Sequence, residues 1–321
     1  MALGKNAHRR VRPNGIAEQA RDGYSHAGIV PRFVKLATIS DQFSDGIAVA
    51  TLPVGNYTYK NQAISLVSSV EIDGVTINDN GTHYVKTANI PDYIEELTLE
   101  IDSEPVRKHL MTELIDLNGF FGHDRTDGVV WMSHAGPNFF NDLRYEDAYC
   151  LGTADLDQLR INFKLTPAFV NGTMRIELNS EHFRVGRPLH YFETYAMRRH
   201  TAASVGEHTI EVDTHSDLSR IYIKGAGLVR AQLVVDEQVV TDGTNLAVRS
   251  LNDLYGRDVT SLDDGFMFDF QRNKDGDKAL RSLEDAAQRR RNAKILVIVE
   301  TSNPTTEIFV YTSKVGKYSQ Q

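Results

Sequence analysis

The chain has 321 residues, of which 41% are hydrophobic and 24% are charged, a composition typical of a globular protein. This length suits two β domains of about 130 to 150 residues each. No apolar run approaches the roughly 20 residues of a membrane-spanning helix, and the N-terminus lacks the apolar core of a secretory signal peptide. Cys150 is the only cysteine, which excludes an internal disulfide and indicates a reducing compartment.

The net charge of −8 is unevenly distributed along the chain. Residues 1–36 contain seven basic and two acidic side chains, a net charge of +5, so residues 37–321 carry a net charge of −13. This basic arm, in which Arg9, Arg10 and Arg12 lie close together, predicts contact with an anionic partner such as a membrane inner face, nucleic acid or a neighbouring subunit. A solvated tail is the alternative. The body is too acidic to bind nucleic acid alone, and no sequence-specific nucleic-acid partner is expected.

Residues 1–36 show neither helical nor strand periodicity, which predicts an extended arm. From Gly46 onwards, short β-rich runs are bounded by Gly, Asp, Asn and Pro, the pattern of a sandwich or barrel. Before a join near Gly186–Pro188 the predicted strands are Ile47–Leu52, Tyr57–Tyr59, Ile64–Ile72, Leu97–Ile101, Gly128–Met132, Leu159–Leu165 and Met174–Leu178. After it they are His208–Val212, Ser219–Lys224, Arg230–Val235, Phe266–Phe270, Ile295–Glu300 and Glu307–Thr312.

Three segments have apolar residues at helical spacing and predict short helices on the β framework. Pro105–Leu117 begins with proline and is followed by Gly119, and Leu246–Tyr255 is followed by Gly256. Asp277–Arg291 ends in three arginines, which suit a helix C-terminus.

An internal repeat is the clearest pattern in the sequence. With one constant offset, a helix with its glycine stop, an Asp-Gly turn with an apolar strand, and a later strand align between the halves. The aligned residues are Leu114, Leu117 and Gly119 with Leu251, Leu254 and Gly256; Asp127–Trp131 with Asp264–Phe268; and Leu159 and Ile161 with Leu296 and Ile298. Upstream, Val70–Asp73 resembles Leu233–Asp236 at a larger offset, so the first copy would hold an insertion before its helix. A repeat of this length indicates duplicated whole domains.

Seven stretches between Gly46 and Val315 carry, in order, a resemblance to a known family. They are Leu52–Gly55, Val70–Gly74, Leu151–Thr153, Leu159–Phe163, Met197–Arg199, Ile221–Gly227 and Gly265–Phe270. Together they resemble the double jelly-roll major capsid proteins of membrane-containing icosahedral bacterial viruses, and within these the corticovirus-type coat protein. Two features depart from the family pattern: the arm before Gly46 is longer, and the insertion follows Gly74.

The resemblance implies an all-β double jelly roll: a basic arm over residues 1–45, a first eight-stranded roll over 46–185 and a second over 186–321. It implies a structural protein, not an enzyme, whose homotrimers tile an icosahedral capsid in the virion after assembly in the host cytoplasm. The implied partners are other copies of the chain, neighbouring trimers, a vertex (penton) protein and an internal membrane reached by the arm. Jelly rolls suit this role because they close most sheet edges and leave broad flanks for repeated contacts.

Catalytic signatures such as nucleotide-binding loops, nucleophile elbows and paired zinc-binding histidines are absent from the sequence. His123 and His134 flank the acidic turn of Asp124 and Asp127 and are weighed as metal ligands against ordinary surface-loop histidines. Asp275 and Asp277 lie in an oxygen-rich loop without EF-hand spacing. Coat proteins of this type can bind calcium, so calcium is the one cofactor considered, with a solvated acidic turn as the alternative.

Arg198 and Arg199 are candidates for contact with acidic groups of a neighbouring subunit, or for capping a loop. Two other functions remain open from the sequence. The first is a receptor- or carbohydrate-binding jelly-roll protein of a viral spike or vertex, which should show exposed aromatic patches. The second is a β-sandwich enzyme, such as a cupin-like or glycan-cleaving one. A glycan-cleaving enzyme should place two carboxylates across a cleft. A duplicated domain without a polar catalytic cluster favours architecture over chemistry.

Overall fold

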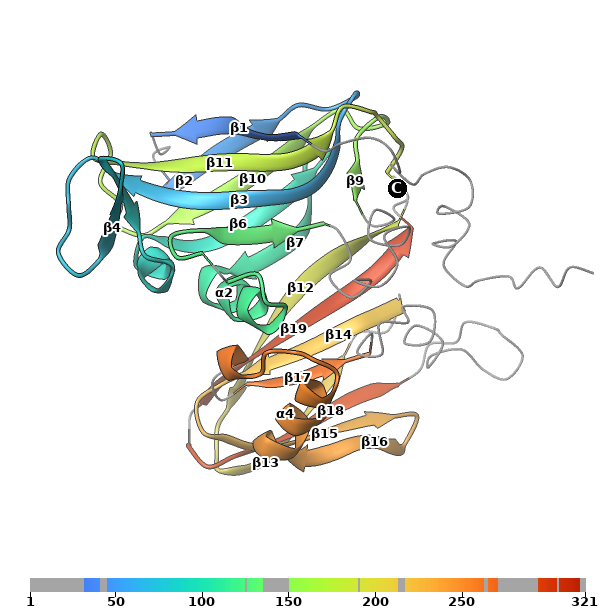
Figure 1. Ribbon diagram of the computed structural model, residues 1–321. Coiled ribbons are helices and arrows are strands. Elements are labelled where there is room, and N and C mark those ends of the chain that lie inside the picture. The colour runs from blue at the N-terminus through green and yellow to red at the C-terminus, as the bar shows by residue number, and fades with distance from the viewer. Residues whose placement is uncertain are drawn as a thin grey trace, which may run out of the picture.

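The computed structural model describes residues 32–40, 45–124, 126–134, 150–189, 191–212, 217–262, 265–270, 294–304 and 306–317. Their strands form three sheets (Figure 1). The first sheet has the order β1 (Arg32–Ile39), β11 (Met174–Phe183), β3 (Thr58–Ser68), β5 (Thr82–Val85), β4 (Thr76–Asp79), and β8 (Val130–Ser133) and β9 (Leu151–Gly152) also pair with β3. The predicted helix Asp277–Arg291 lies outside the described residues.

The second sheet has eight strands and runs through the middle of the molecule (Figure 1). Its order is β17 (Phe266–Asp269), β14 (Asp217–Lys224), β19 (Thr306–Lys317), β12 (Tyr191–Ala202), β7 (Glu104–Leu110), β6 (Ile94–Ile101), β10 (Leu159–Leu165) and β2 (Ile47–Leu52). The third sheet has the order β13 (Gly206–Val212), β18 (Ile295–Thr301), β15 (Leu228–Val235) and β16 (Gln238–Thr244). The helices are η1 (Thr87–Asp92), α2 (Met111–Phe120), α4 (Asn245–Leu254) and η3 (Thr260–Leu262).

These sheets build two jelly rolls. In the first roll, the first sheet packs on the half of the middle sheet formed by β2, β10, β6 and β7. In the second roll, the third sheet packs on the other half, formed by β12, β19, β14 and β17. Each roll has its own apolar core between its two layers. The predicted fold class, an all-β double jelly roll, is confirmed.

Alternation of apolar and polar residues explains why these segments are strands with one buried face. In β10, Leu159, Ile161, Phe163 and Leu165 are buried, while the residues between them face outwards. Because successive side chains of a strand point to opposite faces, this pattern buries one face against the first sheet. Burial of a large apolar side chain contributes about 1.5–3 kcal/mol, so such rows carry most of the stabilisation of each roll.

The same hairpin turn occurs in both rolls. Asp102 and Ser103 join β6 to β7 with φ angles of 50° and 73°, and Asp236 and Glu237 join β15 to β16 with φ angles of 49° and 67°. Two positive φ angles are those of the hairpin turn that suits twisted strands. The carboxylate of the aspartate accepts a hydrogen bond from the backbone N–H that precedes the next strand along the sheet, Gln158 in the first roll and Lys294 in the second. The duplication therefore extends to individual hydrogen bonds.

The structure corrects the register of the repeat. Helices α2 and α4 end before glycines with φ angles of 71° and 73°, Gly122 and Gly256. Gly119, which was aligned with Gly256, lies inside α2, so the predicted helix alignment is three residues out. In the strands it is one residue out, because Leu159 begins β10 and Ile295, not Leu296, begins β18. Ile295 is fully buried and is thus the true counterpart of Leu159.

The extra residues of the first roll lie where the sequence placed them, but their flanking alignment was wrong. Between β3 and β6 the chain forms β4, β5 and η1, whereas β14 and β15 are joined by residues 225–227 alone. Val70–Asp73 follows β3 and is not the counterpart of Leu233–Asp236, which corresponds to Leu99–Asp102. The two segments share an apolar-acidic pattern, but Val70–Asp73 lies after β3, whereas Leu233–Asp236 covers the end of β15 and the start of its turn.

Several predicted elements differ from those observed. The segment predicted as the helix Pro105–Leu117 begins as strand β7, and its helix α2 starts only at Met111. Strand β1, Arg32–Ile39, lies within the segment predicted as the arm and pairs with β11, so the first roll includes residues before Gly46. The boundary predicted between residues 185 and 186 falls between β11 and β12.

Candidate functional site: the junction between the rolls

The two rolls meet where β7 of the first roll lies beside β12 of the second. Arg107 and Tyr195 are Cα partners in this contact, and the strands are parallel. The parallel contact continues one sheet from roll to roll, and helix α2 packs over the same junction (Figure 1). This junction fixes how one roll stands against the other.

A buried carboxylate, Glu193 on β12, is the centre of the junction. It accepts hydrogen bonds from Ser219 Oγ at 2.6 Å, from Tyr195 Oη at 2.7 Å and from Ser313 Oγ. It also forms an ion pair with Arg220, whose side chain is 3% exposed. Burial alone would raise the pKa of Glu193, but the charge of Arg220 and the two serine hydroxyls lower it to about 2. Glu193 is therefore ionised at neutral pH.

Arg107 on β7 ties the first roll to this centre. Its Nε donates to the backbone oxygen of Glu193 at 2.6 Å, and its Nη1 donates to the backbone oxygen of Ser133 at 2.8 Å. Its guanidinium carbon lies 5.3 Å from the centroid of the Tyr195 ring. Burial lowers the pKa of Arg107, but arginine stays protonated in proteins. One cation thus bridges β8 of the first roll and β12 of the second.

Two aromatic rings at the end of α2 lie against two buried arginines of the second roll. Arg220 lies 4.7 Å from the ring centroid of Phe121, and Arg257 lies 5.4 Å from Phe121 and 5.8 Å from Phe120. Nε of Arg257 also donates to Asp269 at 3.0 Å. A guanidinium over an aromatic face contributes about 0.5–2 kcal/mol, more when desolvated. The first roll therefore supplies the rings and the second roll the cations.

Helix α2 makes further polar contacts with the second roll. The carboxylate of Asp116 accepts a hydrogen bond from Tyr222 Oη at 2.9 Å and forms an ion pair with Lys224. Ser261 Oγ donates to the backbone oxygen of Asp116 at 3.1 Å. Ser261 packs so closely on Gly119 that a Cβ at residue 119 would overlap the Ser261 side chain. The helix therefore fits the second roll only with glycine at this position.

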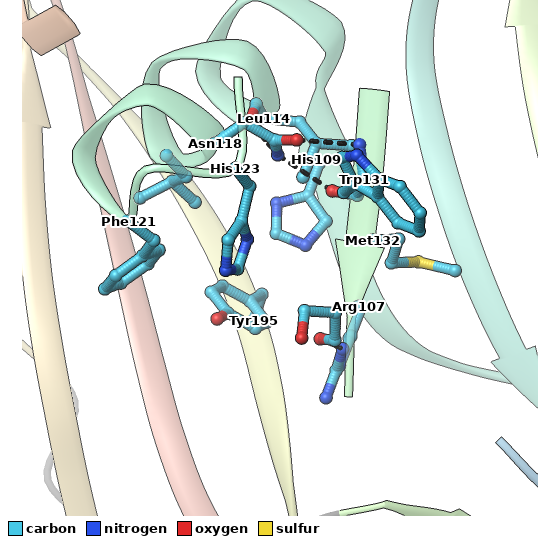
Figure 2. A pocket seen from close by; sticks show the side chains of 11 residues that line it. Arg107, His109, Leu114, Asn118, Phe121, His123, Trp131, Met132 and Tyr195 are labelled. Carbon is cyan, nitrogen blue, oxygen red and sulfur yellow. Dashed lines mark hydrogen bonds between the residues drawn. The ribbon is translucent and has the colours of Figure 1, made fainter. Parts of the chain in front are cut away.

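A small cavity of about 30 Å³ lies on the first-roll side of the junction, lined by α2, β7, β8 and Tyr195. In Figure 2, His109, His123, Tyr195 and Arg107 lie around it, and Asn118 bridges α2 to the strand of Trp131. Asn118 Nδ2 donates to the Trp131 oxygen at 2.8 Å, and the Trp131 N–H donates back to Asn118 Oδ1 at 2.7 Å. Such a space can hold a water molecule but no organic substrate.

A larger groove of about 760 Å³ lies between the end of β7 and the second roll, lined by residues that include Leu110, Lys224, Phe309 and Tyr311.

Within the described ranges, no group of three or more His, Cys, Asp or Glu side chains could hold a metal ion. In the same ranges, no helix is long and apolar enough to cross a membrane.

Two of the candidate residues near the acidic turn, His134 and Asp127, have hydrogen-bond partners within the first roll. His134 is 1% exposed and hydrogen-bonded to Gln62, so the expectation of a surface-loop histidine was wrong. Burial and the nearby Arg107 and His109 charges lower its pKa well below the usual value. The Asp127 carboxylate accepts from the Thr87 N–H at 2.7 Å, which anchors its turn to η1. His123 lines the small cavity, and His134 does not.

Two arginines of β12, Arg198 and Arg199, were predicted to contact a neighbouring subunit. Arg199 is exposed, forms an ion pair with Glu307 of the same chain and lies 5.9 Å from the Phe309 ring centroid. Arg198 is exposed on the neighbouring position of β12. Their contact with another subunit stays a prediction. The candidates Asp275 and Asp277, and the arm residues Arg9, Arg10 and Arg12, lie outside the described residues.

Three residues that build the junction were not predicted from the sequence: Arg107, Glu193 and Arg220. The segment Leu-Ser-Arg-Ile-Tyr-Ile places Arg220 within an apolar strand, which is a weak signal of a buried arginine. The signal is weak because an arginine on the outward face of a strand would give the same pattern. The pairing of Arg220 with Glu193 follows only from the register of β14, β19 and β12.

No protein-family model matches this chain, and no curated protein matches it. Solved structures do share its fold. The major capsid protein P2 of bacteriophage PM2 matches with a TM-score of 0.71 and 17% identity, over 91% of this chain and 99% of that one. The major capsid protein of STIV matches with a TM-score of 0.61 and 11% identity, over 89% and 96%. The capsid of virus PBCV-1 matches with a TM-score of 0.58 and 9% identity, over 92% and 97%.

Proposed function

We propose that this chain is a major capsid protein whose homotrimers form pseudo-hexagonal tiles of an icosahedral shell. The observation that carries the proposal is the pair of matching rolls joined through one continuous sheet. Two equivalent rolls in each subunit give a trimer six similar walls, which can tile a surface with local sixfold packing. The fold shared with three viral capsid proteins supports the same role.

The chemistry of the junction supports a building unit. Its buried charges, Arg107, Glu193 and Arg220, face one another across strands and hold the rolls in one arrangement. Replacing a buried ion pair by apolar side chains is often neutral or stabilising, whereas removal of one partner is costly. Such a network therefore serves better to define one geometry than to add stability, and a tile repeated around a shell requires one geometry.

The finer parts of the proposal concern the surroundings of the tile. The basic arm, with Arg9, Arg10 and Arg12, would contact the head groups of an internal membrane, because anionic lipids attract polybasic segments by about 1 kcal/mol per residue. Neighbouring trimers and a vertex protein would complete the shell in the virion, assembled in the host cytoplasm. Calcium would be bound by the carboxylate oxygens of Asp275 and Asp277.

The mass of the purified protein in solution tests the proposal. A monomer has a mass of 36.0 kDa, and a homotrimer has three times that mass. Native mass spectrometry at micromolar concentration should return the trimer. A stable monomer would rule out the tile and favour the alternative, a receptor- or carbohydrate-binding protein of a spike or vertex, which a glycan array would then examine.

A further inference from the structure

The two rolls correspond residue by residue across their strand rows. In the first roll, one row of Cα partners runs from β1 through β11 and β3 to the last residue of β8: Phe33, Glu181, Asn61 and Ser133. In the second roll, the matching row runs from β12 through β19 and β14 to the last residue of β17: Tyr195, Ser313, Arg220 and Asp269. Phe33 on β1 is therefore the counterpart of Tyr195 on β12.

The strands after the shared hairpin turn correspond in the same way. Arg107 pairs with Leu99 in the first roll, and Thr241 pairs with Leu233 in the second. Both strands have a register irregularity just before this residue, between Leu99/Glu100 and between Leu233/Val234. Thr241 on β16 is therefore the counterpart of Arg107 on β7.

The contact between Arg107 and Tyr195 is the place where the rolls meet inside one chain. The counterparts of its two strands, β16 and β1, are both edge strands, each with one sheet partner among the described residues. They lie at opposite ends of the molecule in Figure 1 and cannot meet each other within one chain. Each roll thus has the same two contact edges, and one of each is used internally.

The two unused edges expose apolar side chains. Phe33 and Val34 on β1 are 56% and 40% exposed, and Val239 and Val240 on β16 are 56% and 58% exposed. An exposed edge strand with apolar side chains promotes uncontrolled strand pairing unless something covers it. A surface of this kind in a soluble protein marks an interaction site.

We propose that β16 of one copy packs beside β1 of the next copy, with Thr241 of one against Phe33 of the other. This contact would repeat between subunits the contact of β7 with β12 within each subunit. The contact joins two different edges and is therefore heterologous. Heterologous contacts form a closed ring when successive rotations add up to one full turn. The inference rests on the proposed trimer, in which three internal and three intersubunit contacts alternate around six rolls.

Cysteine cross-linking tests the contact directly. Neighbouring strands bring Cα atoms to roughly the 4.4–6.8 Å that a disulfide spans, so the double variant F33C/T241C should form disulfides between subunits on mild oxidation. Non-reducing electrophoresis should then show a covalent trimer. Each single variant, F33C or T241C, should show monomer only, and an equal mixture of the two single variants, dissociated and reassembled, should show dimer. The pair F33C/V205C is the matched control, because Val205 is 59% exposed in the turn between β12 and β13.

A charge placed on the edge provides a second measurement that does not depend on disulfide geometry. Val240→Asp should convert the trimer to monomer in native mass spectrometry, with the circular dichroism spectrum unchanged. Val170→Asp is the control, since Val170 is 51% exposed and lies outside both edges.

The outcomes separate the inference from the function on which it rests. A wild-type trimer that forms no F33C/T241C cross-link and tolerates Val240→Asp would overturn the inference and leave the proposed function in place. A wild-type monomer at micromolar concentration would overturn both. A trimer that cross-links, and dissociates on Val240→Asp but not on Val170→Asp, would support both.

Discussion

Glu193 on β12 and Arg220 on β14 form an ion pair whose side chains are 9% and 3% exposed. Ser219 and Ser313 donate to the same carboxylate, and Arg107 donates to the backbone oxygen of Glu193. One buried anion thus holds three strands of the second roll and one strand of the first. Removal of its charge would leave Arg220 buried without its ion-pair partner, which is costly.

Glu193→Gln should therefore destabilise the protein strongly. Glutamine keeps the size of the side chain but leaves the Arg220 charge buried without its ion-pair partner, which costs about 3–5 kcal/mol. Urea unfolding followed by tryptophan fluorescence measures this change. Glu307→Gln is the matched control, because the Arg199–Glu307 pair is 58% and 44% exposed and should contribute less than about 1 kcal/mol. Equal effects of the two substitutions would contradict the assignment.

The pH dependence of stability should carry the signature of Glu193. Its pKa is lowered in the folded protein to about 2, against an ordinary value of 4.5. A lowered pKa contributes stability that is fully present above pH 4.5 and is lost as the pH falls towards 2. The contribution is about 3 kcal/mol. The difference in free energy of unfolding between wild type and Glu193→Gln should therefore shrink as the pH falls from about 5 to about 2. A constant difference over this range would contradict the lowered pKa of Glu193.

Gly119→Ala should destabilise the contact of α2 with the second roll. Alanine favours a helix by about 1 kcal/mol over glycine, but its Cβ would overlap the side chain of Ser261. Overpacking of this kind costs about 1–3 kcal/mol. Ser261→Gly in the same chain should restore part of the loss, and a double-mutant cycle from thermal unfolding measures the coupling. Additive effects would show that the helix can move away from the second roll.

The shared hairpin turn predicts matching effects in the two rolls. Asp102→Ala and Asp236→Ala should each cost about 1–2 kcal/mol, because each removes a hydrogen-bonded carboxylate and places alanine at a positive φ angle. Asp102→Asn and Asp236→Asn should cost less, since asparagine keeps the acceptor oxygen and tolerates that angle. Urea unfolding compares the four variants. Equal losses for Ala and Asn would contradict the role of the carboxylate oxygen.

Truncation distinguishes the arm from the first strand. Removal of residues 1–31 keeps β1 and should leave the unfolding midpoint unchanged, while it weakens binding to vesicles with anionic lipids. Removal of residues 1–39 also removes β1, which pairs along its length with β11, and should lower the midpoint. Arg9→Glu, Arg10→Glu and Arg12→Glu together should reproduce only the loss of vesicle binding in a sedimentation assay. Unchanged binding after both arm variants would show that the arm has another partner.

The sequence predicted the elements whose residues alternate regularly. Strands β2 and β10 have the predicted bounds Ile47–Leu52 and Leu159–Leu165, and α4 begins and ends within one residue of its prediction. Strands β12 and β16 were missed because they are rich in charged and polar residues: β12 contains Arg198 and Arg199, and β16 contains Thr241 and Asp242. Such strands owe their form to neighbouring strands more than to their own pattern.

The repeat illustrates the limit of reading register from apolar spacing. Two helices of similar pattern align equally well when shifted by three residues, nearly one turn, so Gly119 and Gly122 could not be told apart. Asn118 and Asn252 settle the register, since each donates from its helix to the following strand, at Trp131 and at Met267. The junction residues escaped prediction because their partners lie far away in sequence and only the sheet register brings them together.

A cryo-electron microscopy reconstruction of the assembled protein tests the central claim most directly. We expect a particle with threefold symmetry and six similar walls, in which the β7–β12 contact within a subunit alternates with a β16–β1 contact between subunits. A reconstruction in which the two rolls of one chain are not successive walls of the same ring would contradict it.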